Sequence, residues 1–420
     1  CLHNEHMFAN AMLAAQGATD VDKTRLINES IHYLVLHEMG HTMGLMHNMK
    51  ASQLHTPEEL ADPNLTYKTG LIGSVMDYPA INLNKKKTNV QYCQTEPGPY
   101  DLWAIEYGYS QGLDDEAAES ARLKAILEKC IEPKLTFGND ADDMRSSFRG
   151  IDPRVMTGDL SGDQIAYSID RFKIVNNALK KIKNKMTKEG ENYEDLRRAF
   201  YTLSSGATGA GIVLSRFIGG VYVDRSTVGQ KGSTKPYTPV GLSDQKRAMN
   251  AIKNYVFAPN AFTSPNDIYG YLARQRRGQD FGSGPEDPKI HDLVLGNQTR
   301  VLSHLMHPNT LQRIMDSELY GNQYGLSVFM NDLNDAIFKV DNKGSVNTFR
   351  QNLQAVYVKR LIEMVTGSSS DKFKVPAKSL AVYHLNTIEK RTKRPKGDVS
   401  SIAHRIHLNT LITNALKEIK

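Results

Sequence analysis

Apolar side chains recur at intervals of three and four residues along most of this chain, the spacing that places them on one face of an α-helix. Near the start, the pattern predicts helices over residues 5–16 and 20–44, the second from the spacing of Ile27, Ile31, Leu34 and Val35. Farther along, it predicts a glycine-containing helix from Leu196 and helices over residues 101–107, 115–130, 165–186, 243–257, 266–276, 288–305, 308–318, 325–338, 345–366, 378–391 and 398–418. The predicted fold class is therefore mainly α.

Two parts of the chain interrupt the helical pattern. From Lys50 to Thr95, repeated prolines and glycines predict an irregular loop with short turns. Residues 220–223 and 237–240 flank a glycine-containing stretch and predict at most one small β-hairpin.

The best-marked helix is predicted over residues 345–366. Ser345 is expected to cap its start and Gly367 to end it. An apolar stripe of this kind is typical of the core of a helical bundle rather than of a ligand site.

The composition is that of an ordinary globular protein. The 420 residues are 40% hydrophobic and 23% charged, and the net charge is +6, with a mean hydropathy of −0.46. The basic residues are dispersed apart from Lys85-Lys86-Lys87 and a cluster over residues 390–396, which we interpret as solvated faces. We therefore expect no nucleic-acid partner. We also expect no transmembrane segment, because no apolar run reaches membrane-spanning length.

The clearest chemical signal is the segment HEMGHTMGLMH at residues 37–47. His37 and His41 are four residues apart, so both rings lie on one helix face and suit a tetrahedral Zn²⁺. Glu38 follows the first ligand and can act as a general base on water without binding the metal. Gly44 can adopt the left-handed backbone that ends a helix, so the chain can turn and bring back His47 as a third ligand.

A second motif, SVMDYP at residues 74–79, follows the loop. It resembles the Met-turn of the metzincin clan of zinc metallopeptidases. Together, this turn and the elongated histidine motif are similar to those of a metzincin. The segment YDLWAIEYGY at residues 100–109 is similar, more narrowly, to a poorly characterised bacterial metzincin-like family with a long helical C-terminal region.

The resemblance implies one catalytic zinc ion bound by His37, His41 and His47, with Glu38 as the catalytic base. It places Met76 beneath the metal as an apolar floor, which is also what a methionine filling a gap in the core would do. Tyr78 either binds zinc or donates to the oxyanion, or is a packed aromatic residue. Asn48, directly after the third ligand, matches none of the best-known metzincin branches.

The resemblance also shapes the expected domain organisation. We predict the C-terminal portion of a metzincin catalytic domain over residues 1–112 and a helical region over residues 113–420, with a candidate boundary inside it near residue 240. Metzincins carry a twisted sheet before the active-site helix, whereas residues 1–36 predict two helices. We therefore expect this chain to be a fragment whose partner is the upstream part of the same polypeptide. The resemblance further implies an extracytoplasmic location.

An acidic stretch between Lys134 and Asp163 is a candidate for a second cation. Its acidic residues could bind Ca²⁺, although they lack the regular spacing of a known calcium loop; the alternative is a solvated connection. The residues concerned are Asp140, Asp142, Asp143, Asp152, Asp159 and Asp163.

These observations leave three functions open. The first is a zinc-dependent endopeptidase acting on a peptide or protein substrate. The second is a non-catalytic binding or scaffold module built on a metzincin framework, and the third is a hydrolase of a non-protein substrate. An intact set of ligands and base favours the first function.

Overall fold

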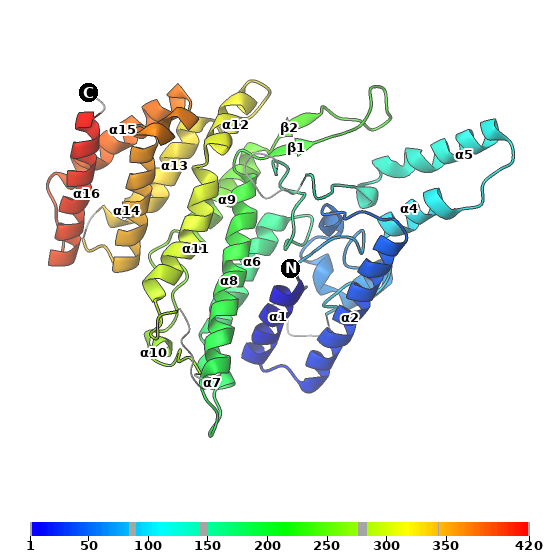
Figure 1. Cartoon of the computed structure of the whole chain (residues 1–420), viewed down its shortest axis with the longest axis horizontal. Helices are drawn as coiled ribbons and strands as arrows, with labels where there is room; N and C mark the ends of the chain where they lie inside the picture. Colours follow the sequence, from blue (N-terminus) through cyan, green and yellow to red (C-terminus); the bar gives the residue numbers. More distant parts are fainter. Residues whose placement is uncertain (1, 84–89, 143–149, 276–283, 343, 419–420) are drawn as a thin grey trace. The chain divides into compact units, whose positions relative to one another are not determined.

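The computed structural model describes residues 2–83, 90–142, 150–275, 284–342 and 344–418. Within these ranges the chain is helical apart from loops and one two-stranded sheet (Figure 1), so the predicted mainly α fold class is confirmed. The sheet pairs β1 (Val221–Val223) with β2 (Tyr237–Pro239) at the predicted hairpin. The Lys85-Lys86-Lys87 run and Asp143 lie outside the described residues. None of the helices within these ranges is both long and apolar enough to cross a membrane.

The chain divides into two compact units. The first comprises Cys1–Val213, Tyr222–Thr238 and Gly270–Arg277, and the second comprises Leu214–Val221, Pro239–Tyr269 and Gly278–Lys420. The boundaries predicted near residues 112 and 240 stay predictions.

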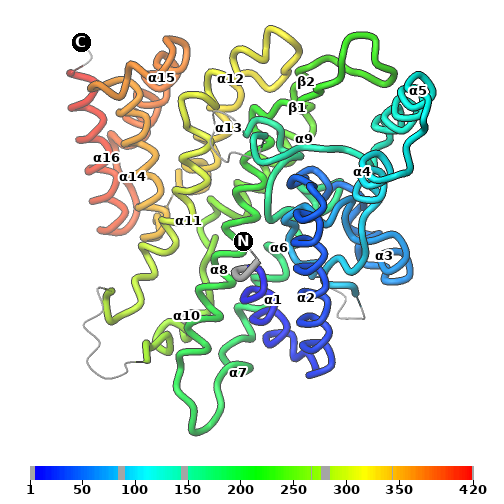
Figure 2. The backbone as a smooth tube through the Cα atoms, turned by 45° about the vertical axis from the view of Figure 1, so that its right-hand side comes forward, coloured from blue at the N-terminus to red at the C-terminus, as the bar shows by residue number. Residues whose placement is uncertain are grey.

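The first unit contains both long helices and helices of only a few residues. They are α1 (Leu2–Gln16), α2 (Asp20–Thr42), η1 (Ala51–Leu54), η2 (Glu59–Ala61), α3 (Pro63–Thr69), α4 (Pro99–Tyr109), α5 (Glu116–Leu127), η3 (Glu128–Ile131), η4 (Pro133–Leu135), α6 (Gln164–Leu179), α7 (Ile182–Met186) and most of α8 (Glu194–Phe217). Helix α1 packs beside α2, as Figures 1 and 2 both show.

Helix α2 is the element on which the histidine motif lies. It begins with a capping box, in which the Thr19 hydroxyl accepts from the backbone N–H of Asp22 and the Asp22 carboxylate accepts from that of Thr19. Its buried face includes Leu26, Tyr33, His37 and Gly40. The apolar residues whose spacing predicted the helix lie instead on an exposed face, with 44–53% of each residue accessible: Ile27, Ile31, Leu34 and Val35.

A buried carboxylate fastens the following loop to α2. Glu29 accepts hydrogen bonds from the Tyr67 hydroxyl at 2.6 Å and from the backbone N–H groups of Tyr92 and Cys93 at 2.6 and 3.0 Å. Because a buried carboxylate needs such donors, these contacts fix where the loop crosses the helix.

The second unit is a helical bundle. Its helices are α9 (Leu242–Tyr255), α10 (Asn266–Tyr269), α11 (Ile290–Leu305), α12 (Pro308–Glu318), α13 (Leu326–Phe338), η5 (Lys339–Asp341), α14 (Thr348–Glu363), η6 (Ser368–Lys372), α15 (Val375–Thr392) and α16 (Val399–Glu418). The expected caps of α14 are corrected: Asn347, not Ser345, accepts from the backbone N–H of Arg350, and the helix ends at Glu363, before Gly367. An Asn at this position is as good a cap as Ser, and it lies closer to the first apolar turn.

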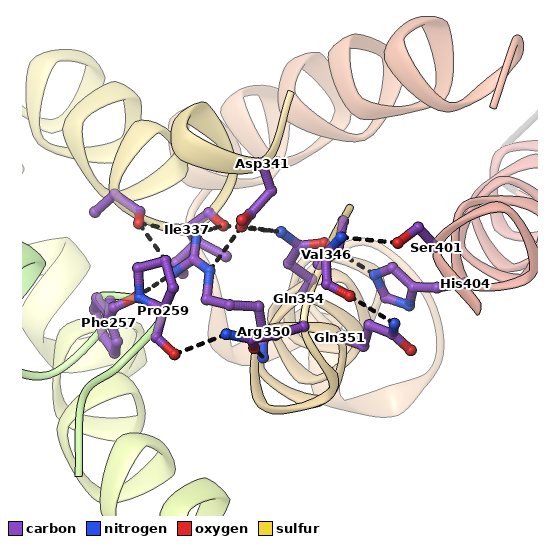
Figure 3. Close-up of polar contacts among 12 residues, drawn as sticks. Phe257, Pro259, Ile337, Asp341, Val346, Arg350, Gln351, Gln354, Ser401 and His404 are labelled. Atoms are coloured by element: carbon purple, nitrogen blue, oxygen red, sulfur yellow. Dashed lines mark hydrogen bonds and ion pairs between the residues drawn. The ribbon is translucent and has the colours of Figure 1, made fainter. Parts of the chain in front are cut away.

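A buried polar network crosses this bundle (Figure 3). The fully buried Arg350 donates to the Asp341 carboxylate at 2.7 Å and to the Phe257 carbonyl. Gln354 donates to the same carboxylate at 2.9 Å and accepts from His404 at 2.9 Å. The network ties η5, α14 and α16 together, because each buried polar group depends on a partner from another element.

Candidate metal centre

Three histidines converge at the C-terminal end of α2. His37 and His41 lie one turn apart, with ring centroids separated by 4.9 Å. One ring nitrogen from each of His37, His41 and His47 lies within 4.8 Å of the other two. Over the described ranges, this is the one group of three or more His, Cys, Asp or Glu side chains with the geometry to hold a metal ion.

The end of α2 explains how the third histidine reaches the other two. Gly44 has a φ of +83°, in the left-handed region that favours glycine. Its N–H donates to the His41 carbonyl at 3.0 Å, and the N–H of Leu45 donates to the Gly40 carbonyl at 3.0 Å. These two bonds form a Schellman motif. The chain reverses there and brings the His47 Nε2 atom to 3.2 Å from the His41 Nε2 atom.

The partners of the three rings determine where their protons lie. His37 Nδ1 faces the Val75 carbonyl at 2.8 Å, His41 Nδ1 faces the Leu45 carbonyl at 3.1 Å, and His47 Nδ1 faces the Asp140 carboxylate at 2.8 Å. Since an acceptor oxygen requires a donor opposite it, each Nδ1 carries a proton, and in the neutral ring the Nε2 atom then presents its lone pair. Burial lowers the pKa of His37, which favours this neutral form.

This donor set fits zinc. Two Nε2 lone pairs at 3.2 Å repel each other unless a cation lies between them, and the separation matches the value of about 3.3 Å expected for two nitrogens on a tetrahedral zinc ion. The Nε2 atom of His37 is buried without a hydrogen-bond partner, which a buried polar atom rarely is. His37, His41 and His47 would therefore hold the metal through Nε2.

A buried aspartate shapes the 74–79 turn that supports His37. The Asp101 carboxylate, at the start of α4, accepts from the Ser74 hydroxyl at 2.5 Å and from the Val75 and Gly98 N–H groups at 2.8 and 2.7 Å. Burial raises the pKa of Asp101, and these three donors oppose that shift by favouring the charged form. Because Asp101 fixes Val75, it also fixes the carbonyl that accepts from His37.

Met76 lies directly against α2. The side chain is fully buried, and a Cβ built on Gly40 would lie only 2.3 Å from the Met76 sulfur. Only a glycine at this position lets the helix and the turn approach so closely. The Met76 carbonyl accepts from the Asn48 N–H at 2.9 Å, so the turn is also joined to the residue after the third histidine.

Tyr78 and Glu38 are the two remaining residues predicted for the site. The half-buried Tyr78 places its hydroxyl 3.1 Å from the His47 Nε2 atom. Burial raises the pKa of Tyr78, and the negative charges of Glu38 and Asp140 raise it further, so the phenol is a proton donor at neutral pH. Glu38 itself is exposed, and its negative charge acts to raise the pKa values of both His37 and Tyr78.

Comparison with known families agrees with this geometry. A family model described as Met-zincin matches residues 19–344, which is more than half of the chain. The chain belongs to the Met-zincin family. None of the curated proteins and none of the solved structures matches it. The expected resemblance to the metzincin clan is thus confirmed, and it indicates a zinc metallopeptidase-like domain.

Several residues that build this Met-zincin site were not singled out for it from the sequence. Asp140 was considered only as part of a possible calcium loop, yet its carboxylate contacts His47. The other described acids of that stretch have separate partners, such as Arg225 for Asp142 and Ser52 for Asp159. Asp101 carried one local signal, because it stands three residues after the Gly98 that caps α4.

Proposed function

We propose that this Met-zincin is a zinc-dependent endopeptidase, with zinc held by His37, His41 and His47. The observation that carries the proposal is the shared orientation of the three rings. Each Nδ1 is engaged by an oxygen acceptor, the Nε2 atoms of His41 and His47 lie 3.2 Å apart, and one ring nitrogen of each histidine lies within 4.8 Å of the other two. Three nitrogen ligands leave a fourth tetrahedral position free, which is the arrangement of catalytic rather than structural zinc sites.

The residues around the metal have complementary roles in peptide hydrolysis. When bound, zinc would act as a Lewis acid that polarises the substrate carbonyl and makes water more acidic. Glu38 takes a proton from the attacking water and delivers it to the departing amine. Tyr78, kept protonated by its surroundings, donates a hydrogen bond to the oxyanion.

Peptide cleavage by the zinc-loaded chain tests the proposal. A mixture of unstructured peptides is incubated with the protein, and new termini are identified by mass spectrometry. We expect Glu38→Gln to reduce cleavage by about 10²–10⁴-fold, as loss of a general base does, while the zinc content stays at the wild-type level. Glu58→Gln is the matched control, because Glu58 is an exposed glutamate in the loop and not part of the site.

The other functions predict different outcomes. Zinc bound without any Glu38-dependent cleavage would favour a binding or scaffold module. Zinc-dependent hydrolysis of esters or other non-peptide compounds, with peptides left intact, would favour a non-protein substrate.

A further inference from the structure

The third histidine differs from the other two in how it is held. His37 and His41 lie on α2 and donate from Nδ1 to backbone carbonyls, whose positions the fold fixes. His47 lies beyond the helix end and donates to a side chain, the Asp140 carboxylate, whose oxygens are 3.0 and 2.8 Å from Nδ1. The orientation of this ring therefore depends on one residue that is 93 positions away in the sequence.

We propose that Asp140 is a positioning residue for the metal centre, which orients His47 and strengthens it as a ligand. A carboxylate that accepts from the outer nitrogen of a metal-binding histidine fixes its tautomer and ring orientation and makes the ligating nitrogen more basic. The inference rests on the proposed function only in that it requires His47 to bind zinc.

Asn48 explains how Asp140 reaches this position. The buried Asn48 side chain donates to the Thr136 carbonyl at 2.9 Å and accepts from the Gly138 N–H at 3.1 Å. The N–H of the next residue, Met49, donates to the Gly138 carbonyl at 2.6 Å. Three hydrogen bonds thus fasten residues 136–138 to the chain directly after His47, and Asp140 follows two residues later.

Close packing on the other side of the segment supports the same arrangement. A Cβ built on Gly138 would lie 2.7 Å from the Val155 side chain, so the segment is held between residues 48–49 and Val155. The amide of Asn48 satisfies both an acceptor and a donor of this segment, which an aspartate at the same position could not do. This gives a physical reason for an asparagine after the third ligand.

The alternative is an ordinary surface ion pair without a role at the metal. The Asp140 side chain is 58% exposed and that of His47 is 21% exposed, and pairs of this kind contribute little to folding. The two interpretations differ in one measurable respect. An incidental pair leaves zinc affinity unchanged, whereas a positioning residue alters zinc affinity and leaves the stability of the metal-free protein nearly unchanged.

The test is a competition between a chromophoric zinc chelator and the full chain, with Asp140→Asn, Asp140→Ala and Asp142→Asn compared with wild type. We expect Asp140→Ala to raise the zinc dissociation constant by about 10–100-fold. Asp140→Asn should raise it less, because the amide oxygen can still accept from Nδ1. Asp142→Asn, the same chemical change two residues away, should stay within about twofold, because Asp142 pairs with Arg225 and not with a ligand.

Metal-free unfolding of each variant, followed by the fluorescence of Trp103, controls for damage to the fold, and the midpoints should coincide. Wild-type affinity in Asp140→Ala, or an equal loss in Asp142→Asn, would overturn the inference and leave the proposed function standing. A wild-type chain that binds no zinc would instead overturn the proposed function itself.

Discussion

Replacing Gly40 by alanine tests how closely α2 and the 74–79 turn are packed. The new Cβ would lie 2.3 Å from the Met76 sulfur, more than an ångström inside normal contact, and Met76 is fully buried. Overpacking of this kind typically costs about 1–3 kcal/mol. Alanine is also a better helix former than glycine by about 1 kcal/mol, which offsets part of that cost. We therefore expect a net destabilisation of about 0–2 kcal/mol.

A matched glycine removes the ambiguity of that small net value. Gly209 is exposed in α8, and a Cβ added there meets no atom within 4 Å. Gly209→Ala should therefore stabilise the protein by up to about 1 kcal/mol through helix propensity alone. The difference between the two substitutions, expected to be about 1–3 kcal/mol, isolates the overlap with Met76.

Urea unfolding of the metal-free chain measures this difference. Trp103 is the only tryptophan of the sequence and lies in the same unit as Gly40 and Gly209, so its fluorescence follows that unit. Met76→Ala combined with Gly40→Ala should cost less than the sum of the two single substitutions, because the shorter side chain leaves room for the new methyl group. If Gly40→Ala stabilised the protein as much as Gly209→Ala does, the close contact between the helix and the turn would be refuted.

Three further substitutions test other parts of the structure. Asp101→Ala leaves the Ser74 hydroxyl and the N–H groups of Val75 and Gly98 without their buried acceptor. We therefore expect the free energy of unfolding in urea, followed by Trp103 fluorescence, to fall by about 3 kcal/mol or more, and zinc binding to weaken. A fall of less than about 1 kcal/mol would contradict this role. Arg350→Met leaves the Asp341 carboxylate buried without its cation. We expect the free energy of unfolding of the second unit, followed by circular dichroism of its helices, to fall by about 3–5 kcal/mol. An unchanged unfolding transition would count against the network. Burial lowers the pKa of His404 from its usual value of 6.5 to about 4. Its contribution to stability is therefore complete above about pH 6.5 and declines as the pH falls toward 4. We expect His404→Gln to make the stability of the second unit less sensitive to pH over that range, and an identical pH profile in wild type and variant would argue against a buried neutral histidine.

The clustering of the three histidines could be predicted from the sequence because their geometry is local. Four residues of helix place His37 and His41 on one face, and the conformational preference of Gly44 accounts for the reversal before His47. The supporting residues are different. Asp140 reaches His47 only because Asn48 holds a segment that is distant in the sequence, and no periodicity or spacing encodes such a contact.

The helical pattern predicted most elements but not always which face they bury. The stripe of Ile27, Ile31, Leu34 and Val35 marked α2 correctly as a helix, yet the face that packs carries Glu29, Tyr33 and His37. Periodicity reports that a helix has an apolar face and does not say what lies against it. Arg350 was missed for a similar reason, since a charged residue is expected outside unless its buried partners are known.

A crystal structure of the zinc-loaded chain, with anomalous data collected on both sides of the zinc absorption edge, tests the metal centre most directly. We expect a single strong anomalous peak at about 2.0–2.1 Å from the Nε2 atoms of His37, His41 and His47, with each Nδ1 still facing its oxygen acceptor. A peak bound through Nδ1, or zinc held by only two of these histidines while the His47 ring points away, would contradict the assignment.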